Sequence, residues 1–315
     1  MDRQKSNHHQ LQENIGAKIL SQSLLSHVGR TPLLKLGDIY AKAEYINPTG
    51  SVKDRAGARM LQTAIERDNI LSDANQREIL DSSSGNTGIS LAAFGASLGL
   101  KVSIVLPESA SIERQKLLKL YGANIIFSDP MDGSDGAIEV ARELYSKYPE
   151  KYYYTDQYSN DANWQAHYFG TAGEIWLQTE GKITHFIAGV GTGGTIMGTG
   201  RRLKELNPQV KIIAVEPDGP FHGIEGLKHI ESAIKPKIFD EKFPDETVFV
   251  KTEEAQKAVL ELSRKEGVFV GTSSGAVFSI ARKYATGENC VVGIFADQGS
   301  RYLSEKYLKV QAGEN

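Results

Sequence analysis

A lysine at the start of a predicted helix is the first residue with a side chain suited to covalent chemistry. Lys53 lies in the segment NPTGSVKDR (47–55), where a proline and a glycine predict a turn and Ser51 predicts a helix N-cap. An ammonium group in the first helical turn opposes the helix dipole, and this position together with partial burial lowers its pKa and yields a nucleophilic amine. From this segment alone, a solvated surface lysine beside Asp54 remains an open alternative.

A glycine-rich loop is the second feature with a chemical use. The predicted strand 183–190 runs into GVGTGGT (189–195), and a predicted helix (196–206) follows directly. Successive glycine N–H groups at a helix N-terminus form an anion-binding site, so this loop predicts a bound phosphate. The residues expected to hold it are Gly191, Thr192, Gly193, Gly194 and Thr195.

The same loop also fits a dinucleotide-binding pattern. Gly189, Gly191 and Gly194 have the required spacing. Glu216 ends the next predicted strand, near the position of the carboxylate that would bind a ribose hydroxyl. A nicotinamide-dependent oxidoreductase is therefore a second hypothesis at this point, because the loop alone does not identify its ligand. A structural tight turn without a ligand is the third interpretation.

Two hydroxyl-rich turns, each between a predicted strand and a predicted helix, complete the candidate site. The segment DSSSGNTG (81–88) offers hydroxyls, an amide and free N–H groups that suit a carboxylate ligand such as that of an amino acid. The segment GTSSGA (271–276) offers hydroxyls that either cap a helix or contact a heteroatom of a cofactor ring. Helix capping alone would use the same residue types in both segments.

Alternating strands and helices must position these loops. Apolar runs alternate with stretches of helical period almost to the end of the chain, which predicts an α/β fold with parallel sheets and crossover helices. The pattern divides into two lobes near residue 155, and the proline-containing stretch 217–247 predicts a long loop or flap. The expected strands are 41–46, 78–80, 102–106, 124–127, 183–190, 211–215, 247–250 and 290–296, and the expected helices include 55–67, 89–98, 111–121, 133–145 and 164–179.

Composition narrows the class of protein. The 315 residues are 40% hydrophobic and 24% charged with a formal net charge of -3, which gives no electrostatic reason to expect a nucleic acid or an anionic membrane as partner. No apolar run reaches the length of a membrane span, and the single Cys290 allows no internal disulfide. We expect a cytoplasmic protein with a small-molecule ligand and no metal site.

In order and spacing, these segments together resemble the cysteine synthase group of pyridoxal-phosphate enzymes, which have the tryptophan-synthase-β-like fold (fold type II). NPTGSVKDR resembles the lysine motif of this family, SGNTG (84–88) its substrate-carboxylate loop, and GTGGT (191–195) its phosphate loop. The segment QYSNDAN (157–163) resembles a further family segment that helps to hold the substrate carboxylate. Resemblance to the cysteine synthase B branch rests on SIER (111–114), LYGA (120–123) and HGIEGLKH (222–229).

The resemblance implies an arrangement of domains. Two three-layer α/β/α domains with mostly parallel twisted sheets would hold the cofactor in the cleft between them. The smaller, mobile domain would comprise residues 45–155, the larger one residues 13–44 and 156–315, and residues 1–12 would form a flexible arm. The family also implies a homodimer. A serine acetyltransferase partner is compatible with the family, but no feature of the sequence indicates it.

The site residues of the family carry over to matching positions. Lys53 would form the Schiff base with pyridoxal 5′-phosphate and later carry the proton at the substrate α-carbon. Asn86 would bond the 3′-hydroxyl of the cofactor, and the loop 191–195 would hold its phosphate. Ser273 would contact the pyridine nitrogen, and such a neutral partner weakens the ring as an electron sink and favours elimination over transamination. The substrate carboxylate would be held by Ser83, Ser84, Gly85, Thr87 and Gln157.

The implied reaction is β-replacement on O-acetyl-L-serine by sulfide, through an aminoacrylate intermediate, which makes cysteine. Asp161 departs from the family pattern and leaves open thiosulfate, homocysteine or an amine as nucleophile, or O-phosphoserine as donor. Ser83 replaces the usual threonine and keeps the hydroxyl. Asp218 stands where relatives that use O-phosphoserine carry arginine, and its charge would repel a phosphorylated donor. A non-catalytic relative is disfavoured because every reactive position is present.

Overall fold

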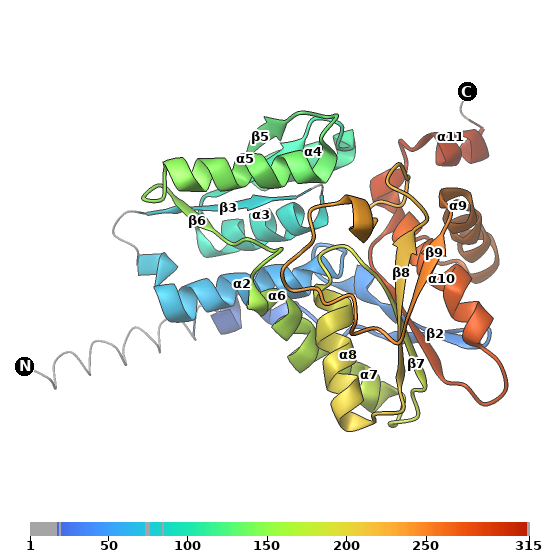
Figure 1. Cartoon of the computed structure of the whole chain (residues 1–315). Coiled ribbons are helices and arrows are strands. Elements are labelled where there is room, and N and C mark those ends of the chain that lie inside the picture. Colours follow the sequence, from blue (N-terminus) through green and yellow to red (C-terminus); the bar gives the residue numbers. More distant parts are fainter. Residues whose placement is uncertain (1–17, 19, 73–75, 84, 314–315) are drawn as a thin grey trace, which may run out of the picture.

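Two β-sheets organise the chain. The computed structural model describes residues 18, 20–72, 76–83 and 85–313. Within these ranges one sheet has four strands and the other has six, and helices cover both (Figure 1). All but one of the neighbouring strand pairs are parallel, so the predicted α/β fold with mostly parallel sheets is confirmed.

The first sheet lies in the middle of the sequence. Its strands, in the spatial order β5-β4-β3-β6, are β5 (Asn124–Ser128), β4 (Val102–Pro107), β3 (Glu78–Ser82) and β6 (Tyr152–Tyr154). Its helices are α2 (Lys53–Asp68), α3 (Asn86–Leu98), α4 (Ile112–Leu120) and α5 (Gly133–Lys147). Ile79 packs toward α2 and α3, whereas Leu80 packs toward α5, because successive side chains of a strand point to opposite faces. Both faces of this sheet are therefore buried, as is usual for parallel sheets.

The second sheet draws its strands from both ends of the sequence. β1 (Leu33–Leu36) and β2 (Ile39–Ala43) precede the first sheet, whereas β7 (His185–Gly189), β8 (Lys211–Pro217), β9 (Glu246–Val250) and β10 (Val291–Phe295) follow it. The spatial order is β1-β2-β10-β7-β8-β9, and only β1 and β2 are antiparallel. The last strand in the sequence thus lies in the interior of the sheet.

Helices cover both faces of the second sheet. Phe186 packs with α7 (Ala172–Gln178) and α8 (Gly194–Leu206), and Ile187 packs with α9 (Thr252–Glu261) and α10 (Thr272–Tyr284) on the other face. The expected helix 164–179 is present as α6 (Asp161–Ala166), the π-helical turn η4 (His167–Thr171) and α7 in direct succession. The other helical segments are η1 (Leu24–His27), η2 (Glu44–Ile46), η3 (Ile70–Ser72), η5 (Ile230–Ser232), η6 (Leu262–Glu266), η7 (Gly299–Tyr302) and α11 (Lys306–Ala312).

Some expected elements differ from the structure. The expected strand 41–46 is displaced toward the N-terminus, because residues 44–46 form the turn η2 and the strand ends at Ala43. The short edge strand β1, with one buried side chain, was not expected from the sequence. A strand expected directly before GTSSGA is reduced to a single bridge between Val270 and Gln298. The stretch 217–247 is largely a loop, as predicted, although it contains η5 and β9 begins at Glu246. The expected arm, residues 1–12, lies outside the described residues.

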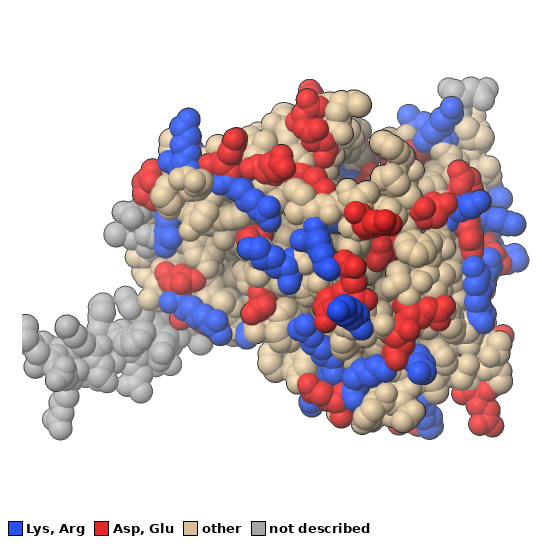
Figure 2. All heavy atoms as spheres, in the orientation of Figure 1, with Lys and Arg blue, Asp and Glu red and all other residues tan. Residues whose placement is uncertain are grey.

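Charges of both signs are mixed on the face of the molecule seen in Figure 2, in keeping with the near-equal numbers of basic and acidic residues, 36 and 39. In the ranges that the structure describes, no helix has the length and apolar character needed to cross a membrane. The same ranges contain no group of three or more His, Cys, Asp or Glu side chains that could hold a metal ion.

Candidate active site

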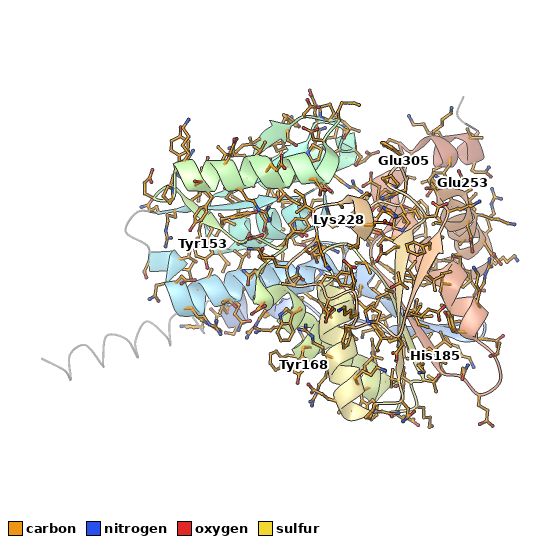
Figure 3. All side chains as sticks on the ribbon, in the orientation of Figure 1. Tyr153, Tyr168, His185, Lys228, Glu253 and Glu305 are labelled. Atoms are coloured by element: carbon orange, nitrogen blue, oxygen red, sulfur yellow. The ribbon has the colours of Figure 1, made fainter. Side chains whose placement is uncertain are left out.

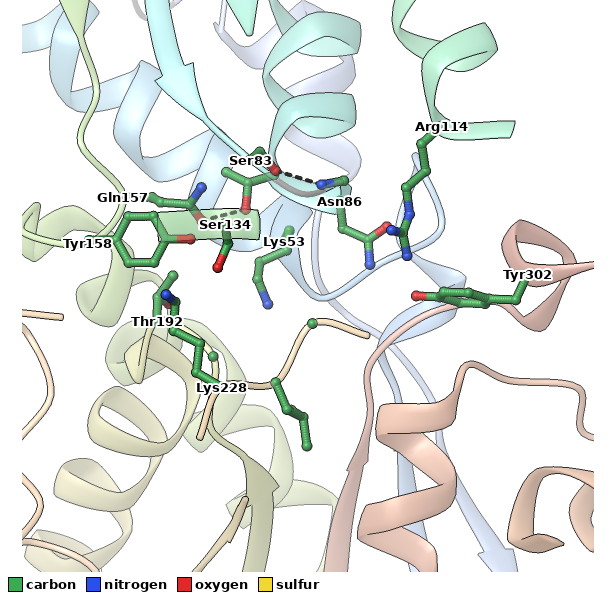
Figure 4. Close-up of a pocket in the computed structure, with 15 residues that line it drawn as sticks. Lys53, Ser83, Asn86, Arg114, Ser134, Gln157, Tyr158, Thr192, Lys228 and Tyr302 are labelled. Atoms are coloured by element: carbon green, nitrogen blue, oxygen red, sulfur yellow. Dashed lines mark hydrogen bonds between the residues drawn. The ribbon is translucent and has the colours of Figure 1, made fainter. Parts of the chain in front are cut away.

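A cavity lined by elements of both sheets brings most of the predicted site residues together (Figure 4). It has a volume of about 60 Å³, and a neighbouring compartment of about 30 Å³ shares Lys53 and Asn86 as lining residues. The predicted residues that line the larger compartment are Lys53, Ser83, Gly85, Asn86, Thr87, Gln157, Gly191 and Thr192. Those that line the smaller one are Lys53, Asn86, Thr195 and Ser273. Ser84 lies outside the described residues.

Lys53 is the first residue of α2, and its side chain faces the larger cavity (Figure 4). The N-cap residue of α2 is Val52 and not Ser51 as predicted; Ser51 precedes it, and Ser51 Oγ accepts from the backbone N–H of Lys53 at 3.3 Å. Burial lowers the pKa of the Lys53 amine, and the negative charge of Asp297 acts in the opposite direction. Asp54 is buried and accepts from the backbone N–H of Thr49 at 2.6 Å. The interpretation of Lys53 as a solvated surface lysine is therefore wrong.

Glycine is required at positions of the loop between β7 and α8 because this loop packs closely against other segments. Gly193 precedes α8 with a φ of 83°, and Gly194 is the first residue of the helix. An added Cβ at Gly191 would overlap the carbonyl oxygen of Gly226, and one at Gly194 would overlap the side chain of Asn163. Backbone N–H groups at a helix N-terminus can bind an anion, and the predicted phosphate loop leads into that end of α8.

Side chains from α6 and η4 hold the two threonines of this loop. Asn163 Nδ2 donates to Thr192 Oγ1 at 3.0 Å and to the carbonyl oxygen of Gln157 at 2.8 Å. The hydroxyl of Thr195 lies 3.3 Å from Nε2 of the buried His167. Burial and the nearby Arg55 lower the pKa of His167 to about 3, so its imidazole is neutral near pH 7. Asn163 thus links the predicted phosphate loop to the predicted carboxylate-binding segment.

The hydroxyl-rich turn after β3 contacts the segment that contains Gln157. Thr87 Oγ1 donates to Gln157 Oε1 at 2.7 Å, and Gln157 Nε2 donates to the carbonyl oxygen of Ser82 at 2.6 Å. Ser83 Oγ accepts from the backbone N–H groups of Gly85 and Gly88 at 3.0 and 3.1 Å. The sequence left open whether this turn caps a helix or binds a carboxylate. Ser83 accepts N–H groups at the start of α3, as a capping side chain does, and it also lines the cavity.

Asn86 and Ser273 approach the smaller compartment from opposite sheets. Asn86 begins α3 beside the first sheet, and Ser273 lies in the first turn of α10 beside the second. Both line the compartment with Lys53, and Ser273 is buried. The positions predicted for contacts with the two edges of a cofactor ring thus line one compartment together with the lysine.

Two cations that line the cavity were not predicted as site residues. Arg114 is 2% exposed, pairs with Glu225 at 2.9 Å, and lies 5.0 Å from the ring centroid of Tyr302. Lys228, which is labelled in Figure 3, pairs with Asp135 of α5, and its amine lies 5.3 Å from the ring centroid of Tyr158. Each pair joins the first sheet's helices to the loop 217–247. Arg114 and Lys228 belong to the segments 111–114 and 222–229, which carry the family resemblance. Their place in these segments was the signal in the sequence that could have indicated them as site residues.

The comparison with protein families decides the class of cofactor. A model of the family described as pyridoxal-phosphate dependent enzyme matches residues 24–295. The chain belongs to this family. Its cofactor is pyridoxal phosphate, and the nicotinamide hypothesis is not supported. Glu216, the residue on which that hypothesis depended, is buried, and its carboxylate accepts the backbone N–H of Ile230 at 3.1 Å.

Relatives of known type place the chain among cysteine synthases. It is 50% identical over 300 residues to a cysteine synthase of Aquifex aeolicus, covering 90% of this chain and 91% of that protein. It is 39% identical to cysteine synthase B of Pseudomonas aeruginosa over 88% of this chain and 94% of that protein. An O-acetylserine-dependent cystathionine β-synthase from Helicobacter pylori has a similar structure, with a TM-score of 0.84, 34% identity, and coverage of 91% of this chain and 98% of that one.

The geometry of the site fits the cofactor of a cysteine synthase-type enzyme. The glycine loop packs closely against Gly226 and Asn163, since a Cβ at Gly191 or Gly194 would overlap them, and it leads into the N-terminus of α8, where backbone N–H groups can bind a phosphate. Lys53, whose pKa is lowered by burial, faces the same cavity. When bound, pyridoxal phosphate supplies an electron-accepting ring conjugated to the amino group of the substrate.

Proposed function

We propose that this enzyme replaces the acetoxy group of O-acetyl-L-serine with sulfide, giving cysteine and acetate. The observation that carries the proposal is that Lys53 and the hydrogen-bonded pair Thr87–Gln157 face one small cavity. An amine is thereby placed beside hydroxyl and amide groups that suit the carboxylate of an amino acid. The similarity to cysteine synthases agrees with this chemistry.

In this proposal Lys53 holds the cofactor and moves the proton at the substrate α-carbon. The burial that lowers the pKa of Lys53 favours the neutral amine, which is the form that attacks a carbonyl carbon and accepts a proton. Asn86 and Ser273, which line the smaller compartment with Lys53, contact the ring, and the loop 191–195 holds the phosphate. Ser273 offers a neutral hydroxyl to the ring nitrogen.

The substrate carboxylate is assigned to the turn after β3 and to Gln157. Thr87 donates its only hydroxyl hydrogen to Gln157 Oε1, and Gln157 Nε2 donates one of its two hydrogens to the carbonyl oxygen of Ser82, so the second hydrogen of Gln157 Nε2 is the remaining donor of this pair. The backbone N–H groups of Gly85 and Gly88 are already bonded to Ser83 Oγ and are not free for the substrate. We therefore assign the carboxylate mainly to Gln157 Nε2 and the hydroxyl of Ser83. The family resemblance adds Ser84, Gly85 and Thr87; Gly85 and Thr87 can donate to the substrate only when their hydrogens leave Ser83 and Gln157.

Substitution of the lysine tests this function directly. Purified native protein should carry bound cofactor with visible absorption, and it should form cysteine from O-acetyl-L-serine and sulfide. Lys53→Ala should lose the lysine-linked absorption band and reduce kcat by at least about 10³-fold, because both covalent attachment and proton transfer depend on the amine. Lys265→Ala, which removes an exposed lysine of η6, is the matched control. Native absorption in the Lys53→Ala protein would refute the assignment.

A second candidate keeps the cofactor and changes the other substrate. An outer cavity of about 450 Å³ shares Arg114, Ser134 and Lys228 with the inner one, which gives room for a larger nucleophile than sulfide. The similar Helicobacter pylori protein is described as an O-acetylserine-dependent cystathionine β-synthase. Initial rates with sulfide, thiosulfate, homocysteine and an amine would separate these reactions, and a sulfide rate far above the others would exclude this candidate.

The sequence suggested that Asp161 affects the choice of nucleophile and that Asp218 affects the choice of donor. Neither suggestion is supported by the residues that line the cavities. Asp161 Oδ1 accepts from Trp164 Nε1 at 2.9 Å, and neither residue lines the described cavities. Asp218 is exposed and is likewise not among their lining residues. We therefore base the choice between O-acetylserine and O-phosphoserine on rates measured with both donors, and not on the charge of Asp218.

We also propose that residues 45–155 form a smaller domain that moves against residues 13–44 and 156–315. The membership of β1 and β2 in the second sheet supports this division.

We propose a cytoplasmic homodimer, supported by family resemblance and by the exposed apolar side chains of Phe169 and Leu177 on η4 and α7, which are 71% and 76% exposed. Light scattering of the purified protein would give the mass of the assembly, and a monomeric mass would refute the dimer.

A further inference from the structure

Asn86 is held between two side chains of opposite charge. Its Nδ2 donates to Asp297 Oδ2 at 2.6 Å, and Arg301 Nη1 donates to its Oδ1. Reversing the amide would place the NH₂ group against a guanidinium and the oxygen against a carboxylate, and both contacts would be repulsive. The two charged residues thus fix one orientation of the Asn86 amide.

Asp297 is itself fixed by its surroundings. It is 1% exposed, and Oδ2 also accepts a hydrogen bond from the hydroxyl of Tyr302. Its backbone forms a bridge with Ser51, and its carbonyl oxygen accepts from the N–H of Gly271 at 3.1 Å. An added Cβ at Gly271 would overlap Asp297 Oδ1, so glycine is needed there to accommodate the carboxylate.

The second carboxylate oxygen of Asp297 suggests a role beyond stability. Oδ1 is buried and has no hydrogen-bond partner among the described residues. A buried polar atom without a partner costs free energy, and the cost is larger for a charged group. A smaller or apolar residue at this position would avoid that cost. The carboxylate is nevertheless present between Asn86 and Tyr302, two residues after the end of β10.

We propose that Asp297 is a positioning residue that makes Asn86 a hydrogen-bond donor toward the cofactor, an inference that rests on the proposed function. An amide NH₂ has two hydrogens, and Asp297 accepts one of them. Arg301 occupies the amide oxygen, which leaves the second hydrogen as the group that Asn86 offers to the cavity. A donor at this point selects an acceptor on the ligand. Asp297 therefore favours the ionised form of the cofactor's ring oxygen over the neutral hydroxyl.

The absorption of the holoenzyme tests this inference without measuring turnover. The bound cofactor absorbs at longer wavelength when its ring oxygen is ionised, so the ratio of long- to short-wavelength absorption reports its state. Asp297→Asn keeps the shape of the side chain and removes the charge that orients Asn86. We expect the ratio to fall at least about threefold and the dissociation constant of pyridoxal phosphate to rise about tenfold, as for the loss of one hydrogen bond to a charged group. Asp38→Asn, in the exposed turn between β1 and β2, should change neither quantity.

A double-mutant cycle shows whether Asp297 acts through Asn86. In an Asn86→Ala background, Asp297→Asn should change the absorption ratio and the dissociation constant less than twofold. The inference would be overturned if Asp297→Asn alone left the absorption ratio and the dissociation constant within twofold of the native values. It would also be overturned if Asp297→Asn changed both quantities as much in the Asn86→Ala background as in the native protein. If Asn86→Ala itself leaves the ratio unchanged, the proposed role of Asn86 fails and this inference fails with it.

Thermal unfolding would reveal whether the Asp297→Asn protein folds. If it does not, the milder variant Tyr302→Phe provides the test. Tyr302→Phe removes one hydrogen bond to Asp297 and keeps the ring against which Arg114 packs. It should shift the absorption ratio in the same direction by a smaller amount. A native ratio in folded Tyr302→Phe protein, together with a misfolded Asp297→Asn protein, would assign Asp297 a purely structural role and overturn the inference.

Discussion

Breaking the ion pair between Asp135 and Lys228 tests how the loop 217–247 is attached to the first sheet. Asp135 lies in the first turn of α5, pairs with Lys228 and accepts the backbone N–H of Ile234 at 2.6 Å. The side chain of Lys228 is 7% exposed, so little water is available to replace the carboxylate. Removing one partner of a fully buried pair costs roughly 3–5 kcal/mol. Because the side chain of Asp135 is 28% exposed, we expect Asp135→Asn to lower the free energy of unfolding by roughly 2–3 kcal/mol.

Urea unfolding followed by tryptophan fluorescence would measure this difference. The matched control is Glu180→Gln, which breaks the ion pair with Lys182 at 2.6 Å between side chains that are 75% and 73% exposed. This exposed pair should contribute nothing measurable. Adding Lys228→Met to Asp135→Asn should restore part of the lost stability, because it removes the unpaired buried ammonium. Equal effects of Asp135→Asn and Glu180→Gln, or a further loss with Lys228→Met, would refute the reasoning.

Three further predictions concern other parts of the chain. Gly194→Ala should weaken cofactor binding at least about tenfold by equilibrium dialysis, because the new Cβ would displace Asn163 from the phosphate loop; an unchanged dissociation constant would contradict this. Burial raises the pKa of Asp81 to about 7, so the native state holds this proton more tightly, and the free energy of unfolding should fall as pH rises from about 4 to 7 and then level off. Asp81→Asn should abolish that part of the urea-unfolding pH profile, and an identical profile would reject the assignment. Burial also raises the pKa of the half-buried Cys290 thiol, so iodoacetamide should react slowly at pH 7 and Cys290→Ser should keep native activity; rapid inactivation would argue for a functional thiol.

The sequence predicts those site residues that lie within short, continuous motifs. Lys53, Asn86 and the loop 191–195 each stand at a junction between a strand and a helix or at the start of a helix, where turn and capping residues have recognisable types. Parallel sheets then bring such junctions to a common edge. Lys53, Asn86, Gly191, Thr192 and Thr195 accordingly line the two neighbouring compartments. Local chemistry left other interpretations of these segments open, and it was their combined order and spacing, through the resemblance to a family, that selected one.

The residues that the sequence did not reveal depend on contacts between distant segments. Asn86 and Asp297 are 211 positions apart, and Arg114 and Glu225 are 111 positions apart. No local pattern distinguishes a buried, paired arginine or aspartate from a solvated one, because the pairing depends on how the two sheets are placed. The same limit applies to β1, whose four residues become a strand only by pairing with β2.

The interior position of β10 has a consequence for how the polypeptide matures during translation. β10 separates β2 from β7 in the second sheet, yet it is the last strand to leave the ribosome. At roughly 5–20 residues per second, synthesis leaves β2 without this neighbour for about 10–50 s. Meanwhile the first sheet, encoded between residues 78 and 154, has all of its strands. The nascent chain therefore carries one finished core and one open sheet with unpaired edges, and it is during this interval that we expect chaperones to bind it.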